Sequence, residues 1–122
     1  MKRRLLGVAA AVCLSILTAS PSWAQSDRAK VDGDAWLNST PDVRKSFLIG
    51  ASSMVALDRA YSRRKGTPAS VVGSRTAEAL EDMTLDEVSA RITRWYEANP
   101  DRRRMPVMAV VWIDIVNPRD RR

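Results

Sequence analysis

The pattern of hydrophobic and polar positions predicts one long amphipathic helix over residues 41–65. At about 100° per residue, six residues project to one side of this helix: Val43, Phe47, Gly50, Met54, Leu57 and Tyr61. The sequence Ser39-Thr40-Pro41 begins the helix, because a hydroxyl oxygen accepts hydrogen bonds from free backbone N–H groups and Pro is tolerated at the first helical position. Gly66, after a run of cations, ends it.

Gly50 lies at the centre of this apolar side. Glycine inside a helix destabilises it by roughly 1 kcal/mol relative to alanine. The close approach of a neighbouring backbone is a reason to keep a residue without a side chain there. We therefore expect the apolar side of the helix to pack at Gly50 against another helix.

Two shorter helices are predicted in the middle of the chain. Residues 67–74 are typical of a loop, and residues 76–82 of a short helix. Thr84 and Glu87 have the spacing of a capping box, in which each side chain satisfies a free N–H group of the other residue. The helix that they open ends at Asn99-Pro100. Its apolar face carries Leu85, Val88, Ile92, Trp95 and Tyr96.

The last element, residues 106–116, is almost entirely apolar. Its Val and Ile content favours a strand, whereas its length and Pro106 at the first turn fit a buried helix. We predict a helix, because no other segment offers strand partners. Asp114 is the one charged residue between Val107 and Val116, so it either faces solvent or is buried beside an arginine. Arg91 itself is four residues after Glu87, a favourable spacing for an ion pair.

The first 24 residues have the three parts of an export signal. Basic residues at positions 2–4 precede an apolar run over 5–17, and small residues precede a cleavage site after Ala24. We expect this signal peptide, 1–24, to be followed by a flexible leader, 25–35, a single helical domain, 36–118, and a basic tail, 119–122. The predicted location is periplasmic or secreted, with no membrane anchor after cleavage.

The charge and residue composition exclude several classes of partner and catalytic site. The chain has 20 basic and 14 acidic residues, and loss of the three basic residues of the signal leaves 17 against 14, a mild excess that predicts no nucleic-acid partner. Histidine is absent, and the single cysteine, Cys13, lies in the signal. The usual zinc ligands and the Ser-His-Asp and Cys-His systems are therefore missing. We expect no cofactor, no metal site and no enzymatic activity.

An alternative is a small cell-envelope enzyme that uses carboxylate, Ser or Tyr chemistry. The acidic residues between Glu81 and Glu87 are explained by helix capping, so they favour this alternative only weakly. As candidate interaction or buried polar positions we name Trp36, Asp58 and Asp114. Trp36 precedes the first long helix and is the aromatic residue most suited to contact a ligand.

Several landmarks together resemble those of a known group of proteins: Gly33 with Trp36, residues 45–50 (KSFLIG), residues 95–100 (WYEANP) and Pro106-Val107. They are similar to small uncharacterised exported bacterial helical proteins and, more loosely, to type VI secretion immunity proteins. The resemblance implies an all-helical fold that binds and neutralises a toxin, and it transfers no catalytic residue.

The sequence as a whole predicts an all-α domain, a small orthogonal or irregular bundle of three to five helices, monomeric or dimeric. The expected function is that of a periplasmic non-enzymatic binding or interaction protein. The expected partner is another envelope protein.

Overall fold

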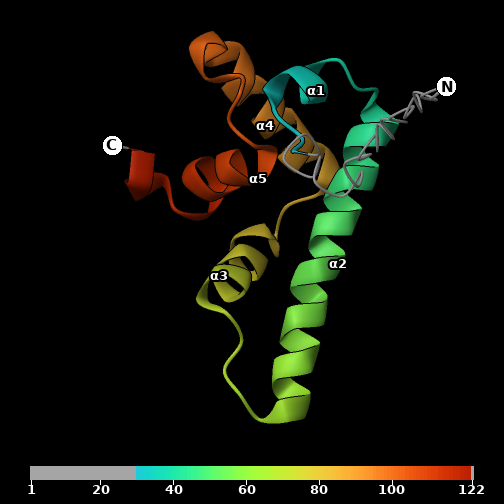
Figure 1. Ribbon diagram of the computed structural model, residues 1–122, viewed down its shortest axis with the longest axis vertical. Coiled ribbons are helices and arrows are strands. Elements are labelled where there is room, and N and C mark those ends of the chain that lie inside the picture. The colour runs from blue at the N-terminus through green and yellow to red at the C-terminus, as the bar shows by residue number, and fades with distance from the viewer. Residues whose placement is uncertain (1–29, 122) are drawn as a thin grey trace, which may run out of the picture.

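The computed structural model describes residues 30–121, which fold into a small bundle of helices (Figure 1). Its α-helices are α1 (Gly33–Leu37), α2 (Pro41–Lys65), α3 (Val71–Leu80), α4 (Leu85–Ala98) and α5 (Val107–Val110). A π-helical segment, Val111–Val116, continues α5, and two 3₁₀ turns span Pro100–Arg102 and Pro118–Arg121. The β pairing found in this part of the chain is one isolated bridge between Asp32 and Pro106. The predicted all-α bundle is therefore confirmed.

The long helix α2 runs along one edge of the molecule (Figure 1). Helices α1, α4 and α5 gather around its N-terminal half, and α3 packs beside its C-terminal half. The π-helical segment contacts α3 as well as α5, so it joins the two halves. Within residues 30–121, no helix combines the length and apolar character that crossing a membrane requires. The predicted signal peptide and its cleavage site lie outside the described residues.

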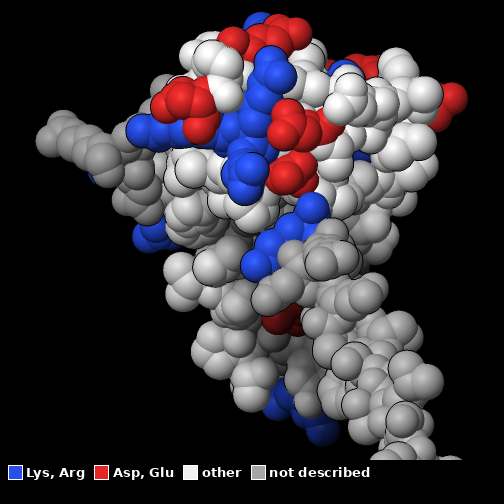
Figure 2. Space-filling model, turned by 45° about the horizontal axis from the view of Figure 1, so that its top comes forward, with Lys and Arg blue, Asp and Glu red and all other residues white. Residues whose placement is uncertain are grey.

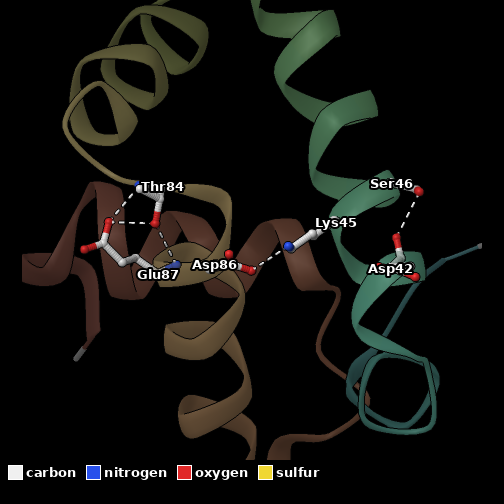
Figure 3. A network of polar contacts seen from close by, with 6 residues as sticks. All are labelled: Asp42, Lys45, Ser46, Thr84, Asp86 and Glu87. Carbon is white, nitrogen blue, oxygen red and sulfur yellow. Dashed lines mark hydrogen bonds and ion pairs between the residues drawn. The ribbon is translucent and has the colours of Figure 1, made fainter.

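The predicted boundaries of α2 and α4 are confirmed by their caps. The Thr40 hydroxyl oxygen accepts a hydrogen bond from the Val43 N–H, and Gly66 ends α2 in a left-handed conformation with φ of 66°. At the start of α4, the Glu87 N–H donates to the Thr84 hydroxyl, and the Thr84 N–H donates to a Glu87 carboxylate oxygen at 2.7 Å (Figure 3). The Thr84 N–H and, to a smaller extent, the Thr84 hydroxyl both donate to the Glu87 carboxylate and hold the pKa of Glu87 below its ordinary value.

The same corner carries a contact between α2 and α4. Lys45 Nζ lies 2.9 Å from a carboxylate oxygen of Asp86 (Figure 3). The hydrogen bond to Asp86 raises the pKa of Lys45. The Lys45 side chain is 40% exposed and that of Asp86 75%, so this ion pair contributes little to stability.

Helix α3 begins earlier than the sequence suggests. We expected a loop over 67–74, yet α3 starts at Val71, because the Ser70 hydroxyl accepts a hydrogen bond from the Gly73 N–H and caps the helix. Ser70 is itself held by α2, since its N–H and hydroxyl both donate to Asp58 Oδ2. A capping serine thus competes successfully with the loop-forming tendency of Gly73.

The final apolar segment is helical, as predicted. Its buried residues, Val107, Val110, Val111 and Ile115, have the spacing of one helix face rather than the alternation of a strand. The main core also includes Trp36, Leu48, Val88, Ile92 and Tyr96. The high strand propensity of Val and Ile is overridden here because α4 and α3 supply an apolar surface on which a helix packs.

Ordered structure starts before the expected boundary at Trp36. Asp32 accepts a hydrogen bond from the Ala35 N–H and caps α1, which begins at Gly33. The Gly33 N–H donates to the Arg103 carbonyl at 2.7 Å, and the Val107 N–H donates to the Val31 carbonyl at 2.9 Å. These bonds tie part of the predicted leader, 25–35, to the loop before α5.

The prediction that Gly50 packs closely against another helix is wrong. A Cβ atom built on Gly50 meets nothing within 4 Å. The same side of α2 is exposed at Val43 (55%), Met54 (65%), Leu57 (59%) and Tyr61 (59%). The residue of α2 that enters the core is Leu48, about 140° away around the helix. Helix α2 therefore has two apolar sides, and the more regular one faces outward.

Tyr96 is closely packed in the core. Its ring lies against Gly33, and its hydroxyl donates to the Met105 carbonyl at 2.7 Å. The side chain is fully buried. Burial, with a smaller contribution from the negative charge of Asp32, raises the pKa of Tyr96 well above its ordinary value.

Gly33→Ala should destabilise the protein, because the added carbon would lie 2.5 Å from the Tyr96 ring and 2.8 Å from the Arg103 carbonyl. We expect a loss of about 1–3 kcal/mol in the free energy of unfolding from this overpacking. Gly50→Ala is the matched control and should gain up to about 1 kcal/mol through helix propensity. Urea unfolding in dilute solution, followed by circular dichroism, measures both. Equal midpoints for the two variants would contradict the assignment of Gly33 to the core.

The buried phenol makes stability sensitive to alkaline pH. The folded pKa of Tyr96 is raised, so its contribution is complete below the unfolded pKa of about 10 and is lost as pH rises above that value. Tyr96→Phe should reduce this alkaline loss, while costing about 1 kcal/mol at neutral pH through the unpaired Met105 carbonyl. Tyr61→Phe, at an exposed position, is the control. Urea midpoints from neutral to strongly alkaline pH test this; parallel profiles for both variants would refute it.

Candidate functional site

Trp36 is a core residue, not a ligand contact. It is 1% exposed, and its indole N–H donates to the Thr93 hydroxyl at 3.0 Å. Arg44 stacks over its ring, 5.6 Å from the ring centre, and Phe47 packs edge-on against it. Because the side chain is almost fully buried and its N–H is paired within the protein, Trp36 has no surface left for a partner.

Asp58 is a structural link between two helices. Its Oδ2 accepts the Ser70 N–H at 3.2 Å and the Ser70 hydroxyl at 2.9 Å. Gly73 permits this approach, since a Cβ there would lie 2.6 Å from the same oxygen. Asp58 therefore fixes the start of α3 against α2.

Of the two alternatives expected for Asp114, exposure to solvent or burial beside an arginine, the structure shows the second. Arg91 Nε donates to Asp114 Oδ2 at 2.8 Å, and Arg91 Nη2 donates to the Asp114 carbonyl. The Asp114 side chain is 13% exposed and that of Arg91 36%. Arg91 thus turns toward the π-helical segment, while Glu87 closes the capping box of α4. The structure places Trp36, Asp58 and Asp114 in three separate contacts and forms no common site from them.

The clearest concave feature is an apolar groove between α2, α3, α4 and the α5 region, with a volume of about 240 Å³. We call it the apolar groove. Its walls are mostly aliphatic and methionine side chains, with Arg59 and Glu81 as the charged residues of its lining. The full lining comprises Leu48, Ala51, Ser52, Val55, Ala56, Arg59, Thr76, Ala77, Leu80, Glu81, Met83, Leu85, Val88, Met108 and Val111.

Small residues on two helices contribute to the apolar groove. Ala51 of α2 and Ala77 of α3 leave space that larger side chains would fill. Met83, between α3 and α4, and Met108 of α5 border that space with flexible thioether side chains. Sequence reasoning missed this groove, because the opposing alanines are brought together only by the packing of α3 on α2. The one available signal was the second, weaker apolar side of α2, at Leu48, Ala51 and Val55.

A second, more open groove lies at the C-terminal half of α4. It is lined by Arg91, Arg94, Trp95, Ala98, Asn99, Arg102, Ile113 and Asp114. Figure 2 shows a band of Lys and Arg side chains across this end of the molecule, with acidic side chains on both sides of it. Arg103, for example, lies 3.9 Å from a carboxylate oxygen of Asp34. The charge of this end is therefore mixed rather than uniformly basic.

Each groove contains a single carboxylate among its lining residues, Glu81 in the apolar groove and Asp114 in the more open one. Within residues 30–121, no three acidic side chains gather as a metal-ligand cluster. Every buried side-chain nitrogen and oxygen of these residues has a hydrogen-bond partner. The apolar groove is therefore the stronger candidate, and its chemistry is that of binding an apolar group.

Asp114→Ala should lower the free energy of unfolding by about 1–3 kcal/mol, between the values for exposed and fully buried ion pairs, because only Asp114 is well buried. The loss leaves Arg91 without its carboxylate partner. Asp86→Ala, which removes the exposed partner of Lys45, should leave stability unchanged. Urea titration of both variants tests the comparison. The importance of the Asp114 contact would be disproved by equal stabilities.

No family model, curated protein or solved structure matches this chain. The features of the molecule that bear on its function are therefore the two grooves, the exposed side of α2 and the pattern of charge. Of these, the apolar groove has the most defined shape.

Proposed function

We propose that this protein is a non-enzymatic binding protein of the bacterial cell envelope, and that its apolar groove receives apolar side chains of a partner protein. The observation that carries the proposal is the groove itself, enclosed on several sides and lined mostly by aliphatic and methionine side chains. Concave apolar sites with a few polar groups at their edge are typical binding sites.

The size of the groove favours a protein partner over a small molecule. Its volume of about 240 Å³ is below the roughly 300–1,000 Å³ typical of sites for drug-sized ligands and cofactors. It suits one or two large side chains inserted as anchors, which supply much of the affinity in protein interfaces. Arg59 and Glu81 are positioned to give the polar rim that such interfaces have.

Two features of the sequence support the envelope part of the proposal. The first 24 residues have the pattern of a cleaved export signal, and the landmarks between Gly33 and Val107 resemble small exported bacterial proteins. The looser resemblance to type VI secretion immunity proteins suggests a more specific version of this proposal. In that version the partner is a toxin, and binding neutralises the toxin. The apolar groove is then the place where the toxin inserts its anchor.

The alternative of a carboxylate-dependent envelope enzyme has less support. Glycoside hydrolysis uses two carboxyl groups about 5–10 Å apart. Each groove of the described residues supplies one, and Asp114 is already engaged by Arg91. Binding is therefore the function that these side chains favour.

Ala77→Phe tests the proposal, because a larger side chain at this position would fill the apolar groove. Tagged wild-type protein should capture a defined partner from the envelope fraction of its source, and the variant should bind that partner at least about tenfold more weakly. Ala90→Phe, on an exposed position of α4, is the matched control and should bind like wild type. Affinity is measured by titration of the purified partner.

Folding must be checked alongside affinity. Circular dichroism and melting temperature establish whether Ala77→Phe retains the native fold, and Met108→Lys supplies a second change at a more exposed position of the groove. If both variants are folded and bind the partner as wild type does, the groove is not the binding site.

A further inference from the structure

We propose that α2 pairs with α2 of a second copy of this chain, in antiparallel orientation, along its exposed apolar side. This side, which we call the α2 stripe, comprises Val43, Phe47, Gly50, Met54, Leu57 and Tyr61. It is distinct from the apolar groove, which lies on another side of the same helix. The inference is therefore independent of the proposed function.

The α2 stripe is apolar, continuous and open. Four of its residues, Val43, Met54, Leu57 and Tyr61, are more than half exposed. Gly50, between them, has nothing near its missing side chain. Figure 1 shows α2 along one edge of the molecule, with the other described helices on its opposite side. Contiguous exposed apolar surface of this kind is typical of an interaction site.

The spacing of the stripe indicates a helix as its partner. Successive members are alternately four and three residues apart, from Val43 to Tyr61. This is a repeat of about 3.5 residues, the period that keeps a seam facing a second helix in a coiled coil. Helix α2 has 25 residues and is about 37 Å long, which gives the seam nearly three heptads.

Antiparallel pairing matches large side chains with small ones. We consider the register in which the midpoints of the two stripes lie opposite each other. Val43 then faces Tyr61 of the second copy, Phe47 faces Leu57, and Gly50 faces Met54. A parallel pair would instead place Gly50 against Gly50 and Tyr61 against Tyr61, which leaves a void in one layer and crowding in another. Phe47 contributes less than the other residues, because it already packs against Trp36.

The residues beside the stripe and at its ends fit the same arrangement. Ser46, Ser53 and Ala60, seven residues apart along one flank, are small and exposed, so they permit close approach of the two helices. Asp42 lies at the first turn of α2, and Arg64 and Lys65 at the last. Antiparallel pairing brings unlike charges and opposite helix-dipole ends together, whereas parallel pairing brings the three-cation ends together.

Sedimentation equilibrium of protein recovered from cells that express the full sequence tests the pairing. Wild type should show a reversible monomer–dimer equilibrium, and Leu57→Glu should raise the dimer dissociation constant at least about tenfold. Ile49→Glu is the matched control. It makes the same kind of change at an exposed position (53%) of the same helix but off the stripe, and should leave the constant unchanged. Circular dichroism checks that both variants are folded.

Cysteine cross-linking tests the orientation. In a Cys13→Ser background, an equimolar mixture of Val43→Cys and Tyr61→Cys proteins should form a mixed disulfide under mild oxidation. Val43→Cys alone should not form a disulfide-linked dimer. Val43 homodimers would overturn the antiparallel register. A monomer at all concentrations would overturn the proposal, and loss of vesicle binding in Leu57→Glu would then assign the stripe to a membrane surface.

The two proposals fail separately. Ala77→Phe, which fills the apolar groove, should leave the dimer dissociation constant as in wild type. Leu57→Glu should still bind the groove's partner. If one substitution abolished both properties while the protein stayed folded, the claim that the surfaces are independent would be overturned.

Discussion

The packing of Tyr96 against Gly33 is the contact on which the rest of the bundle depends. It joins α4 to the start of α1, and the Tyr96 hydroxyl binds the chain again at Met105, just before α5. The start of α1, which is far away in sequence, therefore meets α4 and the loop that follows α4 at one side chain. The chain has a single cysteine, so no disulfide within it can share this task. Replacement of the Tyr96 ring, or a side chain added at Gly33, therefore disturbs the packing of α4 on α1.

Local signals in the sequence were sufficient to predict where the helices begin and end, but not which side of each helix is buried. The capping box at Thr84 and the glycine at position 66 act through neighbouring residues, so the sequence contains all the information that fixes them. The side of α2 that faces the core is not fixed by such local signals. It depends on where α3 and α4 pack, and they pack on the side of Leu48 and Ala51 rather than on the more regular side that includes Gly50. Periodicity identifies an apolar side, but it does not say what covers that side.

The candidate residues illustrate the same division. Asp114 was recognisable because a carboxylate inside an apolar run needs a partner, and Arg91 supplies it across 23 positions of sequence. Trp36 was a candidate interaction or buried polar position because it precedes the first long helix, and the structure places it in the core beside the hydroxyl of Thr93 and the guanidinium of Arg44. The apolar groove had no sequence signature, since a space between alanines arises only when two helices are placed side by side.

The loop over residues 100–106 is attached to the fold through its backbone. The carbonyl of Arg103 binds Gly33, and the carbonyl of Met105 binds Tyr96. The side chains of Arg102, Arg103 and Arg104 point to solvent and contribute little to these attachments. Substitutions at these three positions that keep the backbone conformation and its N–H groups therefore leave both carbonyl attachments in place, and a change at Arg103 also removes its contact with Asp34. The charge of this end of the molecule can therefore be changed at exposed side chains while the backbone contacts beneath them stay the same.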